Sequence, residues 1–70
     1  MADSLSHKIR QARKEAGLTR ERMAPMIGVT LRTLVRYETG ETQRISVNAL
    51  VQIAEATGKP LSFFFEEVAA

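Results

Sequence analysis

Residues 19–40 read TRERMAPMIGVTLRTLVRYETG, which is the pattern of two short helices joined by a tight turn. Thr19 and Thr30 stand at the expected N-caps, because a threonine hydroxyl can accept a hydrogen bond from a free amide of the first turn. Gly28 lies between the two helices, and glycine readily adopts the positive φ of a helix C-terminus. Ala24 is small enough for the second helix to cross the first at close range. The stretch therefore predicts two crossed helices, one on either side of Gly28.

Pro25 lies inside the first of these two helices, beyond its first turn. A proline in a helix interior costs about 3 kcal/mol, because it removes one backbone hydrogen bond and crowds the carbonyl four residues earlier. That carbonyl belongs to Glu21. A bend that is convex toward solvent follows the direction in which helices already curve. We therefore expect a kinked or shortened helix, with the turn at Gly28 intact.

Apolar residues also repeat at helical spacing on both sides of this stretch. A first helix should end at Gly17, a fourth should run from its cap Ser46 to Gly58, and Pro60 suits the first turn of a final helix. The residues expected on the buried faces are Leu5, Ile9, Ala12, Ala16, Met23, Ala24, Met26, Ile27, Leu34, Tyr37, Val47, Leu50, Ile53, Ala54, Leu61, Phe64, Phe65 and Val68. No strand-like alternation is present, so we expect one all-α domain over residues 1–70, a compact five-helix bundle.

The composition excludes several classes of protein. The chain has no cysteine, and hence no disulfide framework and no thiolate metal site. Its N-terminus lacks the apolar region of a signal peptide, and no apolar run is long enough to span a membrane. There is no Ser/His/Asp set, carboxylate pair or phosphate-binding loop, and His7 is isolated. We expect a soluble cytoplasmic protein that is not an enzyme and has no cofactor, metal or small-molecule site.

The charged residues are unevenly distributed. Nine basic and four acidic residues lie between positions 8 and 44, a balance of +5, whereas the rest of the chain holds one lysine and four acids, a balance of −3. A basic front and an acidic back suit a domain that presents one side to a polyanion. The same charges can also be solvated helix faces, and charge alone does not separate the two interpretations.

The sequence LTRERMAPMIGVTLRTLVRYETGE, followed by SVNALVQIAEATGKPLSFFF, resembles the Cro and phage-repressor type of helix-turn-helix domain. This is the large xenobiotic-response-element-like family of bacterial and phage regulators. The resemblance extends from about Ile9 to Phe65, and its most diagnostic part is LVRYETG followed by a capped helix that ends in A-x-x-x-G. It implies the fold and double-stranded DNA binding, but it does not identify the operator sequence.

The resemblance implies that residues 31–39 form the recognition helix, whose N-terminal half enters the major groove. Leu31, Arg32 and Arg36 match positions that usually face bases, and Thr33 matches a position near base or sugar-phosphate. The two arginines are four residues apart and share a helical face, and an arginine can bind guanine O6 and N7 with two hydrogen bonds. Leu31 offers only apolar contact, for example with a thymine methyl group.

The resemblance also implies contacts with DNA phosphates. Arg20 stands where the family most often has a glutamine that touches the backbone, and an arginine can reach a phosphate but cannot accept a hydrogen bond. Thr39, Gln43, Arg44 and the free amides at Ser46 match a second phosphate clamp.

A structural ion pair is implied as well. Arg13 and Glu38 match an arginine and a glutamate that tie the first helix to the end of the recognition helix. Removal of one partner should destabilise the fold more than removal of both, because an isolated buried charge is costly.

These observations favour a sequence-specific DNA-binding domain of a transcriptional regulator, which we expect to be a repressor. One alternative is an antitoxin-like or regulatory domain that uses the same fold to bind another protein. A second is a helical interaction module without a nucleic-acid role. The placement of four basic residues argues against it: Arg20, Arg32, Arg36 and Arg44.

We also expect a homodimer, at least on DNA, because related regulators bind two half-sites about 34 Å apart. One helix cannot turn Phe63, Phe64 and Phe65 to the same side. Helical spacing leaves Phe63 pointing outward. We expect it to form the dimer surface with neighbouring residues of the last helix and with the loop around Ile45, before the fourth helix.

Overall fold

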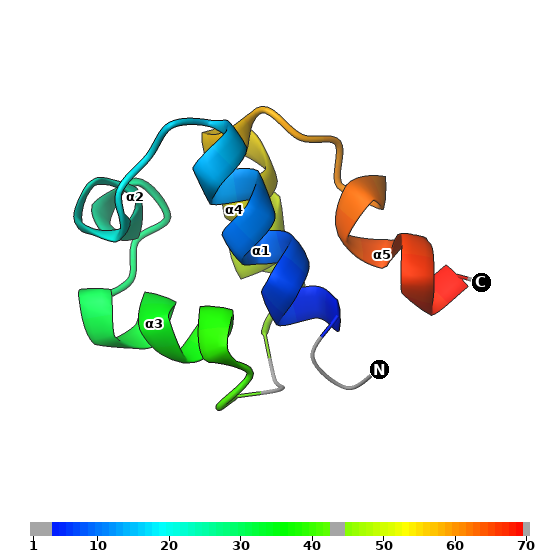
Figure 1. Ribbon diagram of the computed structural model, residues 1–70, viewed down its shortest axis with the longest axis horizontal. Coiled ribbons are helices and arrows are strands. Elements are labelled where there is room, and N and C mark those ends of the chain that lie inside the picture. The colour runs from blue at the N-terminus through cyan, green and yellow to red at the C-terminus, as the bar shows by residue number, and fades with distance from the viewer. Residues whose placement is uncertain (1–3, 43–44, 70) are drawn as a thin grey trace.

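The computed structural model describes residues 4–42 and 45–69, with the backbone only for residue 4 and residues 66–69. This part of the chain forms helices and no strands (Figure 1). The helices are α1 (Ser4–Glu15), α2 (Arg20–Met26), α3 (Leu31–Thr39), α4 (Val47–Thr57) and α5 (Ser62–Ala69). The predicted all-α class and number of helices are confirmed. Among the described residues, no helix has the length and apolar content needed to cross a bilayer.

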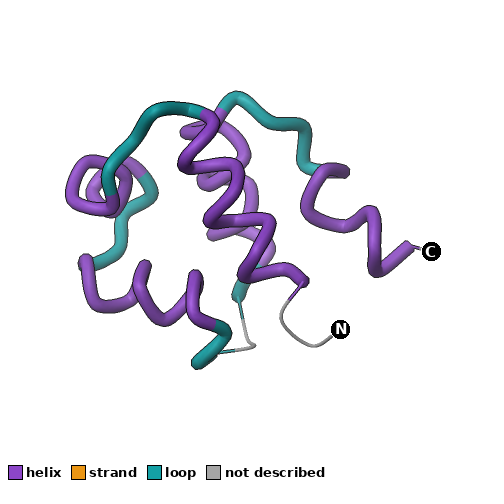
Figure 2. Tube along the Cα trace, in the orientation of Figure 1, coloured by secondary structure: helices purple, strands orange, loops and turns teal. Residues whose placement is uncertain are grey.

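Helix α1 is the central element of the bundle. It contacts α3, α4 and α5, while α2 contacts α3 and α4. Helices α2 and α3 lie on one side of the central α1–α4 pair, and α5 lies on the other side (Figure 1). The tube in Figure 2 shows that short loops make most of these connections. The two helices on either side of Gly28 are therefore held by the rest of the domain and leave one face of α3 free.

The core is built from the apolar stripes of all five helices. Its buried members are Ile9, Ala12, Met23, Ala24, Ile27, Leu34, Leu50, Ile53, Ala54 and Phe64. Each of these residues was expected on a buried face. Leu5, Tyr37, Leu61 and Phe65 are partly buried and pack against this cluster, in agreement with the prediction. The side chain of Val68 lies outside the described part of the structure.

Three residues predicted to be buried are exposed. Met26 is 50% exposed because the buried stripe of α2 is centred on Met23, Ala24 and Ile27, which leaves Met26 at its edge. Val47 is 66% exposed, since the buried side of α4 begins only at Leu50. Ala16 follows the last residue of α1 and lies in the exposed turn. Helical spacing gives the direction of a stripe, but its width depends on the neighbouring helices.

The predicted caps are present at three helix starts. The hydroxyl of Thr19 accepts a hydrogen bond from the Arg22 amide at 3.2 Å, and the hydroxyl of Thr30 accepts one from the Thr33 amide at 3.1 Å. The Ser46 hydroxyl accepts one from Ala49 at 3.0 Å. These bonds fix where α2, α3 and α4 begin, because each satisfies an amide that has no partner within its own helix.

Pro25 does not prevent α2 from forming. The helix has seven residues, is the shortest of the five, and ends at Met26, one residue after the proline. Beyond it, the Val29 amide donates to the Ala24 carbonyl at 3.0 Å, and Gly28 adopts a positive φ of 74°. Pro25 itself is exposed. The result agrees with the expected shortening and with an intact turn.

The prediction that Phe63 points outward is wrong. Its ring meets that of Phe64 edge-on, with 5.2 Å between the centroids. The ammonium groups of Lys8 and Lys59 lie 4.7 Å and 5.0 Å from the Phe63 centroid. Helix α5 lies against α1, so Lys8 and the linker lysine cover a face of the helix that spacing alone assigned to solvent. Ile45 is also partly buried against the core.

Candidate nucleic-acid interface

The start of α3 presents a continuous exposed surface. Leu31 and Arg32 are the first two residues of the helix, and both are exposed. Arg32 has no hydrogen-bond or ion-pair partner among the residues that the structure describes. Thr33 is half-buried, and its hydroxyl accepts a hydrogen bond from the Thr30 hydroxyl at 3.0 Å. Of these three residues predicted to contact bases, Leu31 and Arg32 are thus more accessible than Thr33.

Arg36 continues this surface one turn further along α3. Its side chain is half-exposed, and its Nε lies 3.8 Å from the Glu41 carboxylate in the following turn. An exposed pair at this distance contributes little to stability and leaves both partners mobile. Arg36 is therefore free to exchange Glu41 for another acceptor.

The opposite side of α3 is anchored in the domain. Leu34 is fully buried in the core, and the Glu38 side chain has no exposed surface. Because Glu38 carries a charge into the interior, it needs partners for both carboxylate oxygens.

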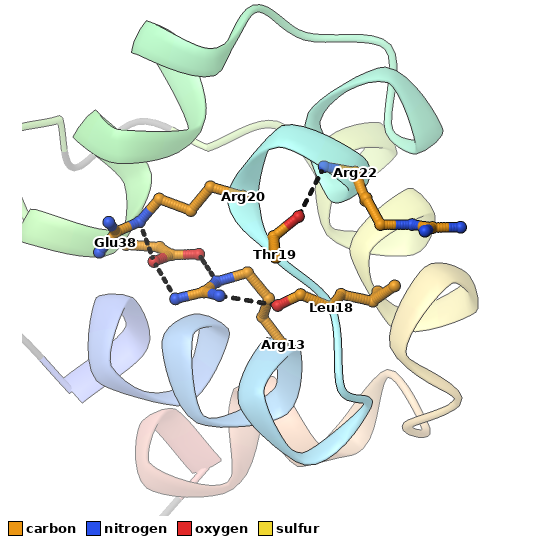
Figure 3. Close-up of polar contacts among 6 residues, drawn as sticks. All are labelled: Arg13, Leu18, Thr19, Arg20, Arg22 and Glu38. Carbon is orange, nitrogen blue, oxygen red and sulfur yellow. Dashed lines mark hydrogen bonds and ion pairs between the residues drawn. The ribbon is translucent and has the colours of Figure 1, made fainter.

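Two arginines supply these partners (Figure 3). The Nε of Arg13 donates to Oε2 of Glu38 at 2.7 Å, and Nη2 of Arg13 donates to Oε1 at 3.3 Å. The Nε of Arg20 donates to Oε1 at 3.0 Å. Nη1 of Arg13 donates to the Leu18 carbonyl at 2.8 Å. The cluster of Arg13, Arg20 and Glu38 thus joins α1, α2 and α3. Its two arginines and one glutamate give it a net positive charge.

The second predicted phosphate site lies between α3 and α4. The Thr39 hydroxyl is exposed and donates to the Arg36 carbonyl at 3.4 Å. The Ser46 side chain is committed to the Ala49 amide, which leaves the backbone amides of Val47 and Asn48 without a partner within the helix. Gln43 and Arg44, which were predicted to contact phosphates, lie outside the described residues.

Residues 9–64 match the model of the helix-turn-helix family. The chain belongs to this family. The matched span includes α2, the turn at Gly28, α3 and α4, together with α1 from Ile9 onward and the first residues of α5. The family expected from the sequence is therefore confirmed.

Helix-turn-helix relatives are found among curated proteins. The chain is 42% identical over 62 residues to an uncharacterised helix-turn-helix-type transcriptional regulator of Rickettsia prowazekii, covering 89% of this chain and 47% of the relative. A regulator of the same description from Sinorhizobium medicae is 33% identical over 60 residues, covering 86% and 42%. An uncharacterised transcriptional regulator in the ATPase CF(0) region of Rhodospirillum rubrum is 34% identical over 64 residues, covering 91% and 58%. The chain spans about half the length of these relatives.

The helix-turn-helix geometry brings together some of the predicted residues and separates others. Leu31, Arg32 and Arg36 share the exposed side of α3. Arg13 and Glu38 meet in the interior. The contact of Arg20 with Glu38 was not anticipated, because 18 positions separate the two residues and no local pattern signals their meeting.

A second unanticipated contact joins Lys59 to Glu15. The Lys59 ammonium lies 2.5 Å from the Glu15 carboxylate, and Gln11 donates to the same carboxylate at 2.9 Å. The hydrogen bond from Lys59 holds the pKa of Glu15 below its ordinary value, with smaller contributions from Gln11 and from the lysine charge. This contact ties the end of α1 to the linker before α5, away from the exposed side of α3.

Proposed function

We propose that this chain is a sequence-specific double-stranded DNA-binding domain of a transcriptional regulator that acts as a repressor in the cytoplasm. The observation that supports this proposal best is the division of α3 into two faces. One face is fixed by Leu34 and Glu38, and the other exposes Leu31, Arg32 and Arg36. A rigid helix that presents arginines at its start and middle suits readout of base edges in the major groove.

In this proposal, Arg32 and Arg36 bind guanine edges, Leu31 contacts a thymine methyl group, and Thr33 lies at the margin of the groove. Arg20, Thr39, Gln43, Arg44 and the amides after Ser46 contact phosphates. The relatives carry the description of transcriptional regulators, which supports the same assignment for this chain.

The decisive experiment is selection of bound sites from random duplex DNA, followed by titration of the best site over 50–200 mM salt. We expect one preferred site and an affinity that falls steeply with salt, because phosphate contacts release counterions. A duplex of shuffled sequence and the corresponding single strand serve as controls. Failure to enrich any duplex would favour the alternative of a protein-interaction domain.

We further propose that two copies bind one operator. One domain of this size reads few bases, and two half-sites about 34 Å apart would restore affinity. The surface proposed from the sequence is not retained, because Phe63 and Ile45 pack within the chain. Sedimentation with a selected palindromic site should give two chains per duplex, and one chain per duplex would contradict the proposal.

A further inference from the structure

Arg20 differs from Arg13 in what remains free after both have bound Glu38. All three guanidinium nitrogens of Arg13 donate hydrogen bonds, two to Glu38 and one to the Leu18 carbonyl. Arg20 uses only Nε. Its side chain is 37% exposed, and its two terminal nitrogens have no partner among the described residues (Figure 3). Arg20 is therefore held by Glu38 at Nε, while its two terminal nitrogens can bind another ligand.

The charges of the cluster show why Arg20 can act toward a further anion. Arg13 makes two hydrogen bonds to Glu38 and neutralises the buried carboxylate. The charge of Arg20 is then in excess at the surface. The planar guanidinium fork matches the spacing of two phosphate oxygens, and the edge between the two terminal nitrogens presents one N–H donor from each to such a ligand.

The position of Glu38, which anchors Arg20, also determines where a bound phosphate would lie. Glu38 belongs to the last turn of α3, while Arg20 is the first residue of α2. The Arg20–Glu38 bond therefore fixes the arginine directly against the proposed recognition helix. A phosphate bound by Arg20 would lie in a fixed relation to Arg32 and Arg36 on that helix.

We propose that Glu38 is a positioning residue, which holds Arg20 by Nε so that its two terminal nitrogens bind one backbone phosphate beside the major groove. This inference rests on the proposed DNA-binding function and extends it. Because the rotamer is fixed before DNA arrives, less side-chain freedom is lost on binding. A lysine at position 20 keeps the charge but cannot be held by one nitrogen while it presents two others.

The first test compares Arg20→Gln and Arg20→Lys on a selected duplex. We expect Arg20→Gln to lower affinity about 10-fold and to reduce the salt slope by about 0.9, the loss of one phosphate contact. Arg20→Lys should recover less than half of that loss on a logarithmic scale. The matched control is Arg22→Lys, because Arg22 is exposed on α2 and its side chain has no partner among the described residues. This control should bind within about twofold of wild type, since an unanchored arginine acts as a simple charge.

The second test removes the anchor. Arg13→Gln combined with Glu38→Gln leaves a neutral pair, and in this background Arg20→Gln should cost no more than about threefold in affinity. In the free wild-type protein, the Arg20 Nε–H group should give an ordered NMR signal with a high heteronuclear NOE. That signal should become mobile in the neutral background. Circular dichroism establishes that each variant is folded, and the NMR measurement on wild type remains decisive if the double variant is not.

Three results would overturn the inference: wild-type affinity for Arg20→Lys, an undiminished effect of Arg20→Gln in the neutral background, or a mobile Arg20 Nε in wild type. Each can occur while wild type still binds duplex DNA with a steep salt dependence, so they count against the role of Glu38 alone. A wild type that binds no duplex would overturn the proposed function and this inference together.

Discussion

Single residues of α3 differ sharply in what they do, although they lie within nine consecutive positions. Leu34 and Glu38 are buried, whereas Arg32 and Arg36 lie one turn apart on the exposed side. A substitution on the exposed side should therefore change binding without changing the fold. A substitution on the buried side should act on the fold first.

We expect Arg32→Ala and Arg36→Ala each to weaken binding to the selected site by about 1–3 kcal/mol, which is the contribution of a bidentate base contact. Thermal unfolding should be nearly unchanged, because neither side chain is buried. Fluorescence anisotropy with the selected duplex measures the loss, and Arg10→Ala, an exposed arginine of α1, is the control. Unchanged affinity in both variants, with normal helical content, would contradict the base-reading role.

At the scale of helices, two polar contacts hold elements together that are far apart in the chain. The cluster of Arg13, Arg20 and Glu38 joins the first three helices. The Lys59–Glu15 pair joins α1 to the linker before α5. The first contact is buried and the second is largely solvated, so the two should respond differently to mutation.

We expect the buried cluster to respond asymmetrically. Glu38→Gln leaves two arginines without their counterion and should cost about 3–5 kcal/mol of unfolding free energy, as for a broken buried pair. Arg13→Gln should cost less, because Arg20 still pairs with Glu38. The double substitution should cost less than the sum of the single ones. Urea unfolding of the four proteins measures the coupling, and strict additivity would show that the pair has no mutual stabilisation.

The Lys59–Glu15 pair predicts a pH dependence with a definite sign. Since the folded-state pKa of Glu15 is depressed, its contribution to stability is present above the unfolded-state pKa. The contribution is lost as pH falls through the folded-state pKa. Lys59→Met should raise the pKa of Glu15 toward its ordinary value, and Gln11→Ala should raise it less. Carboxyl-carbon NMR titration gives both values, and a pKa that Lys59→Met leaves unchanged would exclude the pair.

At the scale of the whole molecule, α5 completes the domain by packing on the side of α1 opposite to α2 and α3. Phe64 contributes a buried ring to the core. The ammonium groups of Lys8 and Lys59 lie over the ring of Phe63. This arrangement assigns Phe63 to the stability of the chain.

We expect Phe63→Ala to destabilise the protein by about 1–3 kcal/mol, less than a fully buried phenylalanine because the ring remains partly exposed. Met26→Ala is the control, since Met26 is a large apolar residue that is 50% exposed. It should change the unfolding free energy by at most about 0.5 kcal/mol. Urea unfolding compares the two variants. If Phe63→Ala lowered only self-association and left stability unchanged, the stabilising role assigned to this ring would be contradicted.

The sequence by itself determined the features that depend on neighbouring residues. The caps Thr19, Thr30 and Ser46 and the turn at Gly28 were predictable because each acts within a few positions of the chain. The buried stripes followed from helical periodicity in the same way. The exposed face of α3, with Arg32 and Arg36, could also be predicted from spacing and from the family pattern.

Apart from the Arg13–Glu38 pair, which the family resemblance implied, only the tertiary structure decided which distant groups meet. The second partner of Glu38, the pairing of Lys59 with Glu15 and the covering of Phe63 each join residues that no local pattern connects. The exposure of Met26 and Val47 belongs to the same class, because the width of a buried stripe depends on the helices around it. Short-range hydrogen bonding and periodicity are encoded along the chain. The width of a buried stripe and the remaining long-range pairings are decided only when the helices pack in three dimensions.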